Sequence, residues 1–263
     1  MIKREFKVNL KSFIIWLSIL ILMFLTTYLI YPYIITDEAM KSMDEMMKMF
    51  PPELLKSFNM DLTTITTAYG WVKSEGFVYF LLAIGIYASF LGLNAILKEE
   101  NDKTIEYSYM LPLNRSKILT NKILVGICYI VGMVLFFGLF NYICLLISGD
   151  FDQKQFILLS FTPIFIGLPF YAVGLFISMF LHKTNFNIGI GLGMVFIFYI
   201  LNMLSELSDK VSYLKYFSIY TLADTRNVIM DVKMNPILIL ISFAITIFFI
   251  ILSYIKYQKK ELI

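Results

Sequence analysis

Residues 123–147 read ILVGICYIVGMVLFFGLFNYICLLI, 25 residues in a row without a single Asp, Glu, Lys, Arg or His. A transmembrane helix needs about 20 mostly apolar residues to cross a hydrocarbon core about 30 Å thick. Five more stretches lack the same five residue types: 13–35, 77–97, 156–181, 188–205 and 236–255. The sequence therefore predicts an all-α integral membrane protein, with residues 1–263 forming a single transmembrane domain of six helices.

The composition excludes several other classes of protein. Of the 263 residues, 59% are hydrophobic and 16% are charged, whereas a soluble domain carries about 25% charged residues. A net charge of +3 without a dense basic run predicts no binding of nucleic acid. Both cysteines lie within 123–147 and the single histidine, His182, lies in a short loop. We therefore expect neither a disulfide nor a metal site.

The first apolar stretch follows a basic segment. It is too long for the core of a signal peptide and no small-x-small cleavage pattern follows it, so we expect it to be retained. Ile2, Phe6 and Leu10 recur every four residues, opposite the lysines, which predicts a short basic helix on the inner leaflet. An ordinary basic flank of the first span would explain the same charges. The basic residues are Lys3, Arg4, Lys7 and Lys11.

The distribution of basic residues predicts the orientation, because Lys and Arg accumulate near helix ends on the cytoplasmic side. With six spans both termini share one side, which carries 13 Lys and Arg against 6 Asp and Glu. The opposite side carries 9 Lys and Arg against 13 Asp and Glu. We expect both termini in the cytoplasm. The abundance of Ile, Lys, Asn and Phe favours a bacterial source, and hence a bacterial plasma membrane.

The first long outer segment, 36–76, begins with an amphipathic helical pattern that Pro51 and Pro52 end. This helix either rests on the membrane or caps the bundle, or it contacts an exported amphiphile, since methionine adapts to irregular apolar partners. The apolar face consists of Met40, Met43, Met47 and Phe50.

Glycine, proline and aromatic residues predict three further features. Gly189 and Gly193 form a Gly-x-x-x-Gly pair, which we assign to helix packing within the bundle before any dimer interface. Thr162-Pro163 and Pro169 should kink the fourth span. The aromatic residues of the second long outer segment, 206–235, favour short re-entrant or surface helices.

The source of energy for any transport must lie outside this chain. Ion-coupled carriers bind protons or ions on titratable groups at membrane depth, and the six predicted spans contain no Asp, Glu, Lys, Arg or His. The sequence also lacks the Gly-x-x-x-x-Gly-Lys-[Ser/Thr] motif that cradles nucleotide phosphates. An intramembrane enzyme is disfavoured too, since Cys128 and Cys144 have no base within any span.

The inner segment 98–122 mixes acids, aromatic residues and bases. Pro112 is suited to the first turn of a helix, which would run on into the third span with Arg115 and Lys122 on one side. These bases suit lipid headgroups or the carboxylates of a docked protein. A solvated loop with ordinary cytoplasmic charges is an equally good interpretation on physical grounds.

The same segment resembles the signature of ABC-2-type permeases. That signature reads Glu-x-x-x-Gly-Thr-[Ile/Leu]-Glu, then Pro-[Ile/Leu]-[Ser/Thr]-Arg-x-x-[Ile/Leu]-x-x-x-Lys. Two positions depart from it, because Lys103 replaces the glycine and Asn114 stands where Ser or Thr is usual. The matching residues are Glu100, Thr104, Ile105, Glu106, Pro112, Leu113, Arg115, Ile118 and Lys122.

The resemblance implies a six-helix bundle of the ABC-2 (type V) exporter kind. In this family two permeases pair within the membrane lipids, two cytoplasmic ATPase subunits dock beneath them, and ATP and Mg bind to the ATPase. This chain would bind no cofactor, and its elbow, 98–122, would be the coupling element. A homodimer is expected, although a sister subunit could complete the channel. The resemblance assigns ATPase coupling to Glu100, Thr104, Glu106, Tyr107, Pro112, Arg115 and Lys122.

More narrowly, the chain is similar to the single permeases of Gram-positive bacteria that export membrane-active peptides such as phenol-soluble modulins. Its length, its opening Lys-Arg-Glu-Phe-Lys and its methionine-rich outer segment carry this likeness. Permeases of this superfamily also export ions, lipids or drugs. A membrane scaffold or sensor that transports nothing is the alternative of a different class.

Overall fold

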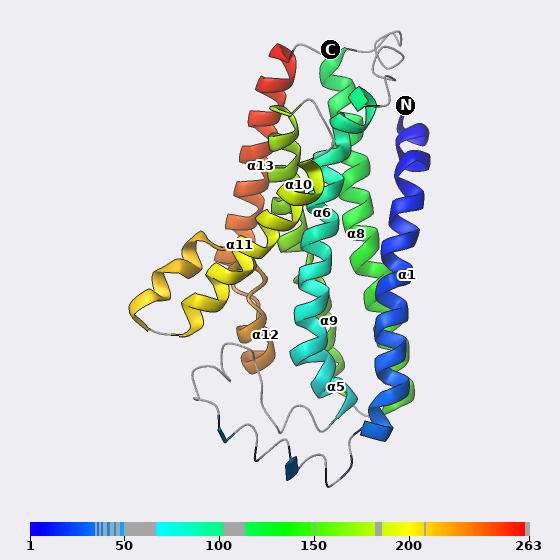
Figure 1. Ribbon diagram of the computed structural model, residues 1–263, viewed down its shortest axis with the longest axis vertical. Helices are drawn as coiled ribbons and strands as arrows, with labels where there is room; N and C mark the ends of the chain where they lie inside the picture. Colours follow the sequence, from blue (N-terminus) through cyan, green and yellow to red (C-terminus); the bar gives the residue numbers. More distant parts are fainter. Residues whose placement is uncertain are drawn as a thin grey trace.

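The computed structural model describes residues 1–34, 36, 38, 41–42, 45, 48–49, 67–101, 114–149, 151–181, 186–207 and 209–260. Throughout these ranges every regular element is a helix. Most of the long helices run side by side along the molecule, whereas α11 (Asn187–Leu207) slants out from its side (Figure 1). The first helix, α1 (Ile2–Ile34), begins at the end of the bundle where α13 (Pro236–Lys259) ends. We call this the terminal end and the opposite one the distal end.

Six helical stretches in the described ranges are long and apolar enough to cross a membrane, which confirms the six predicted spans. The fourth stretch, 153–178, consists of two helices, α9 and α10, and the other five are single helices. Besides α1 and α13, the helices are α6 (Phe77–Asn101), α8 (Arg115–Ser148), α9 (Gln153–Phe161), α10 (Ile164–Ser178) and α11 (Asn187–Leu207).

The centre of the bundle is the contact between α6 and α10. Glycines allow the two backbones to approach closely: a Cβ atom at Gly174 would lie only 2.8 Å from the Ser89 carbonyl oxygen, and Gly92 faces the Tyr171 carbonyl. Small residues have this role at helix interfaces in membranes, where packing replaces the hydrophobic driving force. By contrast, α1 and α13 expose many large apolar side chains, as expected of helices that face lipid.

The fourth span breaks at the predicted place. Pro163 has no N–H to donate to the Leu159 carbonyl, which instead accepts hydrogen bonds from the backbone N–H (3.1 Å) and the hydroxyl (2.9 Å) of Thr162. Pro169 similarly leaves the Phe165 carbonyl without its helical donor, and the buried Ser242 hydroxyl of α13 donates to it at 2.7 Å. Pro163 therefore interrupts the span between α9 and α10. Pro169, inside the continuous α10, frees an acceptor for a hydrogen bond between neighbouring helices.

Two local predictions differ from the structure. The basic N-terminal segment is no separate surface helix, because α1 is continuous from Ile2 and its Glu5 side chain is buried against other helices. Gly189 and Gly193 do not pack within the bundle, since a Cβ atom at either would meet nothing within 4 Å. Gly191, two residues away on the other side of α11, contacts the Phe90 ring instead.

The segment after α11 folds back along it. This segment contains η3 (Asp209–Phe217), η4 (Ile219–Ala223) and α12 (Thr225–Asp231). The Ser218 hydroxyl donates to the Phe198 carbonyl at 2.6 Å, and the Thr221 hydroxyl donates to Asn202 Oδ1 at 3.0 Å. The end of η3 thus lies level with the middle of α11 (Figure 1). The choice between re-entrant and surface helices for this segment stays a prediction.

Candidate functional site

Charged side chains gather inside the terminal end of the bundle. Lys122 of α8, whose side chain is only 3% exposed, places Nζ 3.1 Å from Oε1 of Glu5 and 3.1 Å from Oε1 of Glu99. Arg4 adds a hydrogen bond of 3.0 Å to the same Glu99 oxygen. One ammonium group thereby joins α1, α6 and α8.

A second ion pair joins the other helices of this end. Lys260, just after α13, places Nζ 2.7 Å from Oε1 of Glu100, and both side chains are 3% exposed. The same ammonium donates to the carbonyls of Ser178 (3.2 Å) and Leu181 (3.0 Å) at the end of the fourth span. The Lys260 ammonium thus forms one buried ion pair and two hydrogen bonds to backbone carbonyls.

Hydrogen bonds extend the cluster along α8. Arg115, the first residue of α8, donates to the carbonyls of Lys260 (3.1 Å) and Gln258 (3.4 Å). The Arg115 guanidinium lies at the C-terminal end of α13, where a cation interacts favourably with the negative end of the helix dipole. Deeper in the bundle, the Tyr171 hydroxyl of α10 donates to the Lys122 carbonyl at 3.2 Å.

The ion pairs described above contain three basic and three acidic side chains, so their formal charges sum to zero. Removing a single partner from a buried ion pair costs about 3–5 kcal/mol, because the remaining charge stays buried without compensation. The geometry therefore holds the terminal ends of the helices in a fixed arrangement. We call these residues the terminal charge cluster: Arg4, Glu5, Glu99, Glu100, Lys122 and Lys260.

The cluster lies on both sides of one connection. α6 ends at Asn101, directly after Glu99 and Glu100, and α8 begins at Arg115, seven residues before Lys122.

A family model described as "ABC-2 family transporter protein" matches residues 1–262, nearly the whole chain. The chain belongs to the ABC-2 transporter family. No curated protein and no solved structure matches it at a significant level.

Family membership and the six long apolar helices establish the general role of the chain. It is a multi-pass membrane protein and the membrane subunit of a transporter, with the all-α bundle of the ABC-2 family. In the part of the chain that the structure describes, no three His, Cys, Asp or Glu side chains come together as metal ligands.

The structure brings together three of the residues predicted to couple this ABC-2 subunit to an ATPase. Glu100 and Lys122 are buried and contact neighbouring helices of the same chain, whereas Arg115 lies at the exposed start of α8. Their role in coupling stays a prediction. Outside the described residues lie Thr104, Glu106, Tyr107 and Pro112, and also the outer-surface candidates Met40, Met43, Met47 and Phe50.

The other members of the cluster were not among the predicted site residues. Arg4, Glu5 and Lys260 lie near the chain ends, where basic residues are expected simply as cytoplasmic flanks. Glu99 lies next to the predicted Glu100 at the end of α6. Glu5 carried the one available signal, because it is the single acid in the otherwise basic segment before the first span. A single buried carboxylate there needs a neighbouring cation, and in the structure this cation is the Lys122 ammonium.

Proposed function

We propose that this chain is the permease of an ABC exporter, which moves hydrophobic or amphipathic cargo outward with ATP hydrolysed by a separate ATPase subunit. Two copies of the permease would pair above two ATPase subunits, with both termini of each permease in the cytoplasm. The observation that carries the proposal is the terminal charge cluster, in which Glu99, Glu100 and Lys122 lie at the two ends of the elbow 98–122 and contact other helices.

The cluster connects the elbow mechanically to four helices. A push on the elbow reaches α6 through Glu99 and Glu100, and it reaches α8 through Lys122. The same side chains hold α1 through Glu5 and the end of α13 through Lys260. Because breaking these buried pairs is costly, the terminal ends of four helices would move together when the elbow moves.

The absence of charge at depth supports an imported source of energy. The acidic and basic side chains of the cluster lie near helix ends, and the apolar stretches between them contain no Asp, Glu, Lys, Arg or His. An ion-coupled carrier needs such groups along its path. The cargo is proposed to be a membrane-active peptide of the phenol-soluble modulin type, which the apolar outer face Met40, Met43, Met47 and Phe50 would contact.

The test is reconstitution with the ATPase that co-purifies from native membranes. The permease alone should hydrolyse no ATP, and the complex in vesicles should release an amphipathic peptide to the far side only when ATP is present. Glu106→Ala and Arg115→Ala should reduce this release while leaving membrane insertion intact. Lys7→Ala, an exposed position on α1 outside the elbow, is the matched control. ATP hydrolysis by the isolated chain, or transport driven by an ion gradient, would overturn the proposal.

A further inference from the structure

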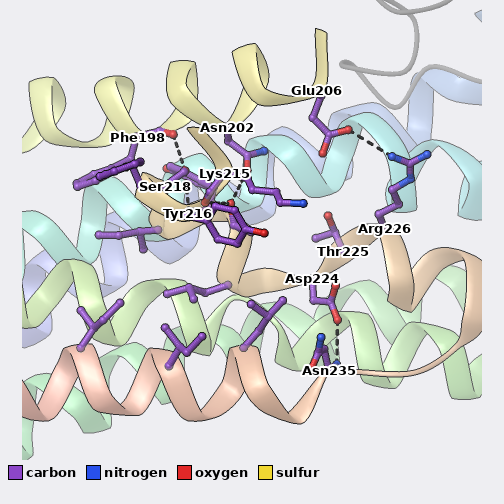
Figure 2. Close-up of a pocket in the computed structure, with 18 of the residues that line it drawn as sticks. Phe198, Asn202, Glu206, Lys215, Tyr216, Ser218, Asp224, Thr225, Arg226 and Asn235 are labelled. Atoms are coloured by element: carbon purple, nitrogen blue, oxygen red, sulfur yellow. Dashed lines mark hydrogen bonds and ion pairs between the residues drawn. The ribbon is translucent and has the colours of Figure 1, made fainter. Parts of the chain in front are cut away.

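A cleft lies between α11, the returning segment η3–η4 and α13, on the distal side of the bundle (Figure 2). Its volume is about 720 Å³, within the range of about 300–1,000 Å³ that is usual for small-molecule sites. The buried side chains of Ile219, Tyr220 and Leu222 fix the returning segment against the core. The wall that this segment forms is therefore held in place by contacts within the subunit.

One wall of the cleft is an apolar stripe of α13. Leu238, Ile241, Ile245 and Phe249 line it, and their spacing of three or four residues places them on one face of the helix. From the first to the last of them the helix rises about 17 Å, at about 1.5 Å per residue. This length is close to the hydrocarbon thickness of one leaflet, about half of 30 Å.

The distal mouth of the cleft is polar and balanced in charge. Glu206 and Arg226 form an ion pair of 3.7 Å across it. The Asp224 carboxylate accepts hydrogen bonds from Asn227 Nδ2 (2.7 Å) and from the Asn235 backbone N–H (2.9 Å). Both acids at the mouth are thus engaged by neighbouring groups.

Lys215 is the remaining basic side chain that lines the cleft. Its ammonium lies over the Tyr216 ring, 5.2 Å from the centroid, and the structure gives it no ion pair with any described acid. Figure 2 shows the side chain extending from η3 toward the end of the cleft where Thr225 and Asn235 lie. The Lys215 side chain is exposed, and a long lysine side chain can carry its ammonium to the polar edge of an apolar surface.

We infer that the cleft binds a membrane phospholipid, with one acyl chain along the α13 stripe and the phosphate at Lys215. The length of the stripe matches one leaflet, and the cation lies at the end of the stripe where a headgroup would be. The mouth carries two acids, Glu206 and Asp224, and two bases, Lys215 and Arg226, so its net charge excludes neither zwitterionic nor anionic phospholipids. Such a lipid would fill the gap between the returning segment and α13.

The size of the cleft disfavours a helical peptide as the occupant. A helix about 10 Å wide that filled 720 Å³ would be only about 9 Å long, or about six residues. Most of an amphipathic peptide would remain outside. An extended acyl chain is narrower than a helix and can contact the full length of the α13 stripe.

The experiment measures lipid retention by native mass spectrometry on the delipidated chain in detergent. Phosphatidylglycerol and diacylglycerol with identical acyl chains are the probes. Ile245→Trp fills the cleft, and Ile247→Trp is the matched control, because Ile247 is 55% exposed and does not line the cleft. One phosphatidylglycerol should bind tightly to the wild type and to Ile247→Trp, and its affinity should fall at least about tenfold in Ile245→Trp.

A second pair of variants tests the phosphate contact without altering the core. Lys215→Gln should weaken phosphatidylglycerol about threefold to tenfold, as for a lost charge-assisted contact that is partly exposed, and should leave diacylglycerol unchanged. Lys233→Gln, exposed in the loop before α13, should change neither. Free glycerol phosphate should not compete.

Several results would overturn the inference. Equal lipid retention in both tryptophan variants would mean a non-specific belt of lipid only. Competition by glycerol phosphate would mean a site for a free anion, and displacement of the lipid by an amphipathic helical peptide would mean a cargo site. None of these measurements uses an ATPase, so the inference can fail while the exporter proposal stands, and the reverse also holds.

Discussion

The two ends of this ABC-2 subunit are held together by different chemistry. At the terminal end, Lys122 and Lys260 form buried ion pairs with carboxylates from other helices. At the distal end the Glu206–Arg226 ion pair is largely exposed. The buried side chains there form neutral bonds: the Tyr69 hydroxyl donates to Gln155 Oε1 at 2.6 Å, and Gln155 Nε2 donates to the Ile229 carbonyl at 2.7 Å. Burial, and secondarily the charge of Asp152, raises the pKa of Tyr69, which keeps this hydroxyl a donor.

The difference indicates where the subunit resists deformation. Losing one partner of a buried ion pair costs about 3–5 kcal/mol, whereas leaving a neutral buried acceptor without its donor costs about 1–3 kcal/mol. The terminal end, next to the elbow, should therefore move as a unit. The distal end, where cargo would leave, can rearrange its hydrogen bonds at lower cost.

The largest effect is expected from Lys122→Met. This change leaves Glu5 and Glu99 buried without their shared ammonium, although Arg4 still contacts Glu99. The free energy of unfolding should fall by about 3–5 kcal/mol, measured by denaturant titration in detergent. Lys117→Met, at an exposed position of the same helix, should change it by less than about 0.5 kcal/mol.

Neutralising the acids together with the lysine gives the decisive comparison. Glu5→Gln and Glu99→Gln added to Lys122→Met should recover much of the lost stability, because no uncompensated charge remains buried. If the triple variant were as unstable as Lys122→Met, packing would explain the loss and the electrostatic account of the terminal end would be wrong.

A smaller effect is expected at the distal end from Tyr69→Phe. The variant keeps the ring and leaves the buried Gln155 Oε1 without its donor, so the unfolding free energy should fall by about 1–2 kcal/mol. Tyr79→Phe is the control, because Tyr79 is 48% exposed on α6. A loss as large as that of Lys122→Met would remove the contrast between the two ends.

Much of the fold could be predicted from the sequence, for a simple reason. Apolar stretches such as 123–147 can be recognised as spans from the sequence alone, since their length and lack of charged residues suffice. The break at Pro163 is equally local, because the missing N–H acts on its own helix. These features were predicted correctly.

The terminal charge cluster could not be predicted in the same way, because it depends on three-dimensional packing. Glu5 and Lys122 are 117 residues apart in sequence, and nothing in the local pattern pairs them. The Gly189–Gly193 prediction failed for a related reason: spacing shows that two glycines share a helix face, but not which neighbour that face meets. In the structure the bundle meets the opposite face, at Gly191.

Between the two ends, the hydrogen bond from Ser242 to the Phe165 carbonyl should contribute less than either. Hydrogen bonds between transmembrane helices are worth about 0.6 kcal/mol on average, so Ser242→Ala should lower the unfolding free energy by about 0.5–1 kcal/mol. Because Pro169 creates the vacant acceptor, the serine should matter less in a Pro169→Ala background. A double-mutant cycle measures this coupling, and strict additivity would contradict it.

The smallest effect concerns Asp224, at the mouth of the cleft. Burial raises the pKa of this carboxyl, although hydrogen bonds from Asn235 and Asn227 act in the opposite direction. A raised folded-state pKa favours the protonated form, so this contribution to stability is complete below the ordinary aspartate value of about 3.9. It is lost as the pH rises through the folded-state pKa. Asp224→Asn is neutral at every pH, keeps a side-chain oxygen for the Asn235 N–H, and suits the left-handed backbone at φ 49°. The unfolding free energy of the wild type minus that of the variant should therefore decrease from acidic to neutral pH. A difference that increased with pH would mean that the two hydrogen bonds outweigh burial, and that the distal end, like the terminal end, is stabilised by an ionised carboxylate.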